Sequence, residues 1–155
     1  MVAVLGGTIL ETSLESAILS RFVPLDAKKD TLLLSDEGPL SSFWAKIHLA
    51  FALGLINRQI RDELDAIRIV RNSFAHSLMK MTFNTKAVRD VCNDLTQYWK
   101  LTIAGGGGAR KPKDRYIASV IYITKVLKSQ ITAKPYSAAY LTPNSSWVPG
   151  PMPRS

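Results

Sequence analysis

The residues best suited to catalysis or ligand binding in this 155-residue chain lie in one short run, "RNSFAH", from Arg71 to His76. At about 100° per residue of helix, Asn72 and His76 lie on one flank together with Asp65, and Arg71 lies beside them. An arginine is always charged and its fork of donors suits a phosphate, whereas a histidine titrates near neutral pH. Together they could steady a scissile phosphate and move a proton to or from a ribose hydroxyl or leaving oxygen, without a metal ion.

The same residues also have a purely structural interpretation. Arg71 falls on the apolar stripe of a long expected helix, and a guanidinium on such a stripe must be paired. The stripe consists of Ile60, Leu64, Ile67, Arg71, Phe74 and Leu78. The candidate carboxylate partners are Glu11, Glu15 and Asp94. His76 would then only end the helix, where its ring interacts with the last carbonyls. Both interpretations stay open.

The other reactive residue types favour structural roles. The glycine run 105–108 lacks the Gly-Lys-Ser/Thr that opens a helix in a phosphate-binding loop, so it predicts a linker. Cys92 has no neighbouring base on its apolar helix face, and His48 lies on a core-packing helix, so neither is assigned a role. A single cysteine and no cluster of ligands predict no disulfide, no metal site and no cofactor.

Composition narrows the class of protein. Apolar residues make up 46% and charged residues 21% of the chain, as in soluble globular proteins. The net charge of +8 suits an acidic partner such as nucleic acid, although only the run Arg110 to Arg115 is dense. The N-terminal segment lacks a basic region and contains Glu11 and Glu15, and the apolar passage around 47–56 is too short to span a bilayer. We expect a cytoplasmic protein with no membrane association.

Helical periodicity organises most of the chain. It predicts helices over residues 4–22, 42–54, about 58–78, about 86–99 and 114–131, with a short helical turn within 31–40. Ser41 or Ser42 and Asn57 can cap the second and third of these helices, and Gly54 can end the second with a positive φ. No run alternates apolar and polar residues as a strand does. The sequence predicts an all-α fold, a compact bundle of about five helices.

The periodicity also predicts which side chains face inward. On the second, fourth and fifth helices these are Phe43, Ile47, Ala50 and Phe51; Val88, Val91, Cys92, Leu95 and Trp99; and Ile117, Val120, Ile121, Thr124 and Leu127. We expect one domain over residues 1–132, with a glycine-rich linker at 104–112 before the last helix. Five of the eight prolines occur from Pro135 onward, so residues 133–155 are expected to form an irregular or disordered tail.

The pattern of Arg, a polar residue, three further residues and His, near the end of a long helix, resembles the signature of HEPN domains. This resemblance implies a four- or five-helix bundle that often dimerises, so that two Arg and His pairs form one composite cleft. In many members it also implies metal-independent cleavage of RNA. Carried over to this chain, the catalytic residues would be Arg71, Asn72 and His76.

A second resemblance spans roughly residues 6–127. The segments "GTILETSLESAILSRF", "GPLSSFWAKIHLAFALGLINRQIRDELDAIRIVRNSFAHS", "FNTKAVRDVCNDL" and "DRYIASVIYITKVL" resemble, in order and spacing, the mannitol operon repressor (MltR) family. That family implies a compact all-α protein named for transcriptional regulation. The long helix mixes Arg58, Arg61 and Arg68 with three carboxylates, and no helix-turn-helix pair stands out, so direct reading of DNA is not favoured.

These observations predict a repressor-type transcriptional regulator that works as a helical interaction domain. Its partner is expected to be a protein or a nucleic acid, RNA or DNA, and a homodimer is expected. The alternative is a HEPN-type, toxin-like endoribonuclease, so whether the protein is an enzyme stays open.

Overall fold

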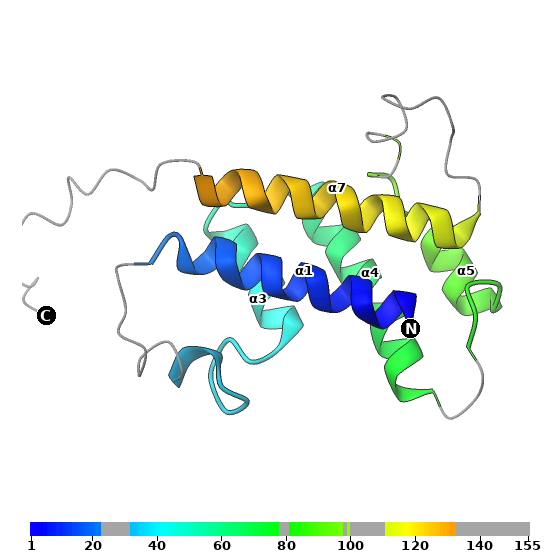
Figure 1. Ribbon diagram of the computed structural model, residues 1–155, viewed down its shortest axis with the longest axis horizontal. Coiled ribbons are helices and arrows are strands. Elements are labelled where there is room, and N and C mark those ends of the chain that lie inside the picture. Colours follow the sequence, from blue (N-terminus) through cyan, green and yellow to red (C-terminus); the bar gives the residue numbers. More distant parts are fainter. Residues whose placement is uncertain (23–31, 78–80, 98, 100–110, 133–155) are drawn as a thin grey trace, which may run out of the picture.

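The computed structural model describes residues 1–22, 32–77, 81–97, 99 and 111–132 (Figure 1). Five helices are defined there: α1 (Val2–Leu19), α3 (Phe43–Ala52), α4 (Arg58–His76), α5 (Lys86–Asn93) and α7 (Pro112–Thr132). Residues 32–34 add a helical turn, and no strand occurs in this part of the chain. The prediction of an all-α bundle is confirmed. Most of the expected linker 104–112 and the whole expected tail 133–155 lie outside the described residues.

Helices α1 and α7 run side by side in the same direction (Figure 1). Near the start of both helices, the Tyr116 hydroxyl donates a hydrogen bond to the Ala3 carbonyl at 2.6 Å. Just beyond the end of α1, the Arg21 guanidinium donates to the Gln130 carbonyl at 3.3 Å. α1 also packs on α3 and α4, and α5 contacts both α4 and α7. The bundle therefore places the end of α4 against α1, where Arg71 meets its neighbours.

The predicted helix caps are confirmed. The Ser42 hydroxyl accepts from the Ala45 N–H at 3.0 Å, and the Asn57 side-chain oxygen accepts from the Ile60 N–H at 2.9 Å. Gly54 has a φ of 69°, which suits a residue without a Cβ directly after a helix. α7 begins two residues earlier than predicted, at Pro112, whose fixed φ and missing N–H suit a first turn.

The end of α5 differs more from the prediction. The helix was expected to continue to Trp99, but it stops at Asn93. The carboxylate of Glu63 on α4 accepts hydrogen bonds from the backbone N–H groups of Thr96 and Gln97. These donors are therefore committed to another helix and cannot bond to carbonyls within α5. Trp99 is 47% exposed, so its predicted inward position is wrong.

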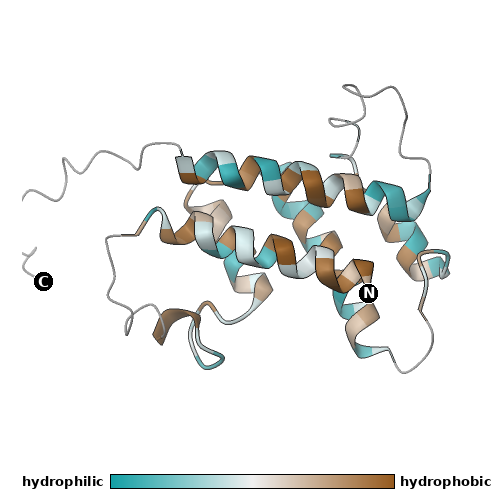
Figure 2. Ribbon diagram, in the orientation of Figure 1, coloured by the Kyte–Doolittle hydropathy of each residue, from teal (hydrophilic) through white to brown (hydrophobic). Residues whose placement is uncertain are grey.

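The core lies between the helices, where their apolar faces meet (Figure 2). Its fully buried large side chains include Leu10, Leu14 and Ile18 of α1, Ile47 of α3, Leu64 and Ile67 of α4, and Tyr116, Ile123 and Leu127 of α7. By length and composition α1 alone, among the described helices, could also span a membrane. Its buried face, with Leu10, Leu14 and Ile18, belongs to this core, whereas Val2, Leu5 and Ile9 are exposed.

Two further residues that were predicted to face inward are exposed. Phe51 is 37% exposed, and the Arg61 guanidinium lies over its ring, 4.6 Å from the centroid. Ile121 is 45% exposed, because the inward face of α7 is centred on Tyr116, Val120 and Ile123. Helix α7 has apolar residues on more than one side, so periodicity alone placed Val120 and Leu127 correctly but not Ile121.

Candidate functional site

Helix α4 brings Arg71, Asn72 and His76 to one surface groove of about 310 Å³, opposite the start of α3. We call it the α3–α4 groove. Its lining consists of Glu11, Ser41, Ser42, Phe43, Trp44, Arg68, Arg71, Asn72 and His76. The three predicted site residues therefore share one groove, as the helix geometry required.

Arg71 is held from two sides. Its Nη1 donates to the side-chain oxygen of Asn72 at 3.0 Å, and its Nη2 lies 3.9 Å from a carboxylate oxygen of Glu11. Of the three predicted carboxylate partners, only Glu11 pairs with it: Glu15 pairs with Lys46, and Asp94 lines a different pocket. The Arg71 side chain remains 30% exposed. Arg71 is therefore paired with a carboxylate and is still within reach of a ligand in the groove.

The path of Arg71 depends on a glycine. A Cβ built on Gly7 of α1 would lie 2.5 Å from Cγ and 2.9 Å from Cβ of Arg71. These are near atoms of the side chain, so they cannot swing away as a distal group could. Gly7 thus lets the aliphatic stem of Arg71 cross α1 closely and bring its guanidinium to Glu11. The glycine pair near the N-terminus was a sequence signal for this approach, and sequence reasoning missed it.

Gly7→Ala is expected to lower the free energy of unfolding by up to about 2 kcal/mol, because an overpacking cost of about 1 to 3 kcal/mol equals or exceeds a gain of about 1 kcal/mol in helix propensity. Urea unfolding followed by circular dichroism measures the change. Thr8→Ala, at the exposed neighbouring position, is the control and should not destabilise the protein. A Gly7→Ala protein more stable than wild type would contradict the close approach.

Glu11 joins Arg71 to a second cation that sequence reasoning also missed. Lys46, with a side chain only 7% exposed, places its Nζ 3.2 Å from Glu11 and 3.2 Å from Glu15. A lysine within the apolar helix α3 had signalled an unusual environment. The resulting cluster, Glu11, Glu15, Lys46 and Arg71, ties α1 to both α3 and α4 beneath the groove.

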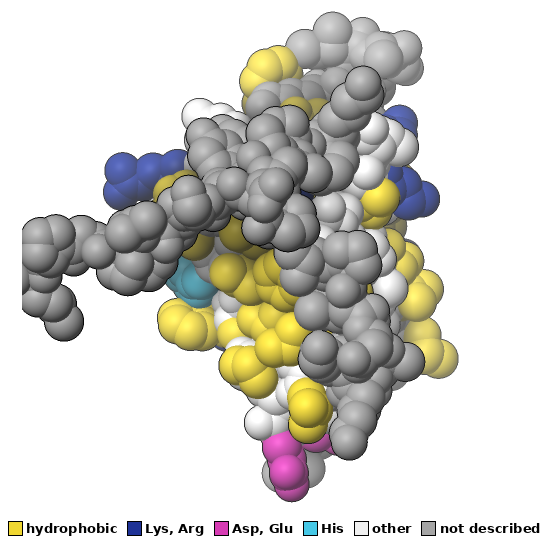
Figure 3. Space-filling model, turned by 90° about the vertical axis from the view of Figure 1, so that its left-hand side faces the viewer, with side chains coloured by type: hydrophobic (Ala, Val, Ile, Leu, Met, Phe, Trp, Pro, Cys, Tyr) yellow, Lys and Arg dark blue, Asp and Glu magenta, His cyan; other side chains and the backbone are white. Residues whose placement is uncertain are grey.

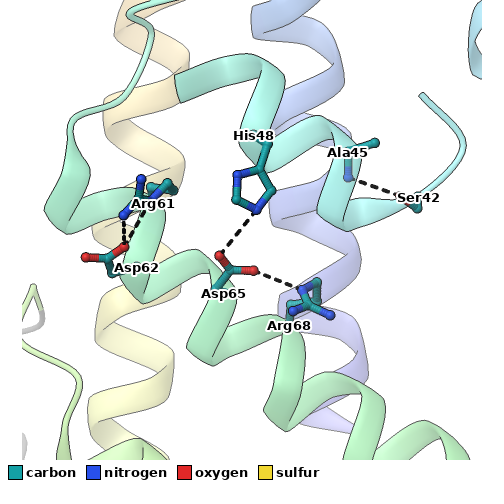
Figure 4. Close-up of polar contacts among 7 residues, drawn as sticks. All are labelled: Ser42, Ala45, His48, Arg61, Asp62, Asp65 and Arg68. Carbon is teal, nitrogen blue, oxygen red and sulfur yellow. Dashed lines mark hydrogen bonds and ion pairs between the residues drawn. The ribbon is translucent and has the colours of Figure 1, made fainter. Parts of the chain in front are cut away.

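Asp65 does not join the groove with Asn72 and His76, although it was predicted on their flank. Its carboxylate accepts from the Arg68 Nε at 3.1 Å and lies 3.8 Å from Nε2 of His48 (Figure 4). The His48 ring in turn lies 4.3 Å from the Trp44 ring, centroid to centroid. His48, which the sequence left without a role, thus orients the aromatic side of the groove, and Asp65 orients Arg68.

His76 occupies the last turn of α4 and is exposed. The groove therefore presents two guanidinium groups, one imidazole and the backbone amides at the start of α3. Each of these favours a negatively charged group, although Glu11 offsets part of the positive charge. The arrangement can hold a carboxylate or a phosphate.

The remaining reactive groups are buried or dispersed. Burial raises the pKa of the Cys92 thiol to about 11, so the thiol stays protonated and is a poor nucleophile. Burial likewise raises the pKa of the Tyr116 phenol. No group of three or more His, Cys, Asp or Glu residues suited to a metal occurs in the part of the chain that the structure describes.

No protein-family model matches this chain, and no curated protein does. Among solved structures, the chain is similar to one described as the MtlR-HPr complex from Escherichia coli. The two share 17% sequence identity with a TM-score of 0.60, over 84% of this chain and 87% of that chain. At this identity the likeness shows a shared fold, and it supports the resemblance to the mannitol operon repressor family at that level.

Proposed function

We propose that this protein is a cytoplasmic, repressor-type regulator that acts by binding a protein partner through the α3–α4 groove. The observation that carries the proposal is the exposed Trp44, at 53%, beside Arg68 and Arg71 in that groove. Tryptophan and arginine are the residue types that contribute most binding energy at protein interfaces. An exposed tryptophan that shares a groove with two arginines is therefore typical of an interface.

The groove is organised before any partner binds. Asp65 contacts both Arg68 and His48, and His48 packs against Trp44, so one carboxylate helps to hold a cation and an aromatic ring. Side chains already held in place lose less entropy on binding. With two arginines in the groove and a net charge of +8, the complementary partner segment is acidic.

The wider surface and the fold also support protein binding. Figure 3 shows hydrophobic side chains gathered beside a histidine on one face, whereas the carboxylates in view are confined to one end. The structure similar in fold is a complex of MtlR with a protein, HPr. On α4, the carboxylates Asp62 and Asp65 lie beside Arg61 and Arg68, so this helix lacks the uniformly basic face of a DNA-reading helix.

The test compares Trp44→Ala with wild type against a purified acidic partner identified by affinity capture. Loss of a central tryptophan should weaken binding by about thirtyfold, equivalent to about 2 kcal/mol, measured by titration calorimetry. Phe51→Ala is the matched control, because Phe51 is an exposed aromatic of the same helix outside the groove lining. Equal affinities of the Trp44→Ala and wild-type proteins would reject the groove as the binding surface.

The second candidate is a metal-independent endoribonuclease. It is favoured by the convergence of Arg71, Asn72 and His76 on one groove with Arg68. In this proposal Arg71 steadies the scissile phosphate and His76 transfers the proton, and a homodimer brings two grooves together. Cleavage of RNA in the presence of EDTA, abolished by His76→Ala without a change in thermal stability, would establish it. No cleavage by wild type would reject it.

A further inference from the structure

A second pocket lies where the start of α1, the end of α4, residues 81–84 and the start of α7 meet. Its volume is about 430 Å³, and it shares no lining residue with the α3–α4 groove. We call it the terminal pocket. It is lined by Met1, Val2, Phe74, Met81, Thr82, Phe83, Asn84, Lys111, Pro112 and Lys113.

One wall of the terminal pocket is aromatic and firmly supported. The Phe74 and Phe83 rings lie 5.1 Å apart, and the Phe83 and Tyr116 rings 5.4 Å apart, centroid to centroid. Tyr116 is fully buried and anchored by its hydrogen bond to Ala3. The row of rings therefore leads from the pocket into the core, and the wall is pre-formed.

The charged side chains that line the terminal pocket are all positive. Lys111 and Lys113 are its charged side chains, both are exposed, and no carboxylate is among the ten lining residues. They flank Pro112, the first residue of α7, where the helix dipole is also positive. An apolar wall beside two lysines complements a molecule with an apolar body and one negative charge.

We propose that the terminal pocket binds a small anionic amphiphile, an aromatic or acyl carboxylate. Its apolar body packs on Phe74 and Phe83, and its carboxylate faces Lys111 and Lys113. The pocket volume falls within the range of about 300 to 1,000 Å³ typical of small-molecule sites. This site is independent of the protein-binding function proposed for the groove.

The test uses octanoate and benzoate as ligands and 1-anilinonaphthalene-8-sulfonate as a fluorescent probe. Heteronuclear NMR of the full chain should show saturable binding, with the largest amide shifts at Thr82, Asn84 and Lys111. Octanoate or benzoate should displace the probe. The two carboxylates distinguish an acyl from an aromatic preference.

The charge requirement is tested with a double variant, Lys111→Gln with Lys113→Gln. It should bind the probe and the carboxylate at least about tenfold more weakly, since two partly screened contacts to the anion are lost. Lys125→Gln with Lys128→Gln, at exposed positions of the same helix, is the matched control and should bind as wild type does. Unchanged affinity in the first double variant, shifts centred elsewhere, or no saturable binding would each overturn the proposal.

Discussion

Glu63→Ala is expected to lower the free energy of unfolding by about 3 to 4 kcal/mol, a large fraction of the stability of a small domain. Glu63 is 5% exposed, and its carboxylate accepts from the backbone N–H of Thr96 at 3.0 Å, the Thr96 hydroxyl at 3.2 Å and the Gln97 N–H at 2.9 Å. Hydrogen bonds to a charged group contribute about 1.5 to 3 kcal/mol each, and Gln97 N–H would be left buried without its acceptor.

Urea unfolding followed by circular dichroism measures this loss. Asp62→Ala is the matched control: the neighbouring carboxylate is 59% exposed and pairs with Arg61, so its removal should cost less than about 1 kcal/mol. Glu63→Gln should fall between the two, because the amide keeps one acceptor oxygen but turns a donor toward other donors. If Glu63→Ala cost no more than Asp62→Ala, the anchoring role of Glu63 would be wrong.

Lys46→Met should destabilise the fold by about 3 kcal/mol, near the lower end of the range for breaking a buried ion pair, since Glu15 is partly exposed. Methionine keeps the length and apolar character of the stem, so the change removes mainly the charge. Glu15 is then left without its cation, and Glu11 keeps only the more distant Arg71.

A charge-neutral combination separates electrostatics from packing. Adding Glu15→Gln to Lys46→Met removes one carboxylate together with the one cation, leaves Glu11 paired with Arg71, and should recover much of the lost stability in thermal and urea unfolding. Lys125→Met, at an exposed position of α7, controls for the substitution itself and should leave stability unchanged. A double variant less stable than Lys46→Met alone would mean that the residues matter through packing and not through charge.

Much of the fold was predictable because local signals determined it. Ser42 and Asn57 accept hydrogen bonds from free N–H groups at helix starts, and Gly54 adopts the positive φ that follows a helix end. Each of these roles can be predicted from the residue type and its position in the sequence. The inward face of α7 and the end of α5 were not predictable in the same way. Ile121 and Val120 are adjacent apolar residues, and only packing against α1 and α5 selects between their faces.

The sequence predicted which residues form the candidate site, but not which residues they contact. Helical spacing sufficed to gather Arg71, Asn72 and His76 on one side of α4. Which carboxylate would pair with Arg71 depended on the close crossing at Gly7, a property of two helices and not of one. The same limit applies to Asp65, whose partner His48 comes from another helix.

Glu11 pairs with two cations, Lys46 in the interior of the bundle and Arg71 in the groove. An anion that enters the groove competes with Glu11 for Arg71, so groove occupancy and the packing of α1 are thermodynamically linked. Linkage is reciprocal: the free energy by which a bound anion weakens the Glu11–Arg71 pair equals the free energy by which that pair weakens anion binding. This carboxylate therefore acts as a built-in competitor that sets how strongly the groove can bind.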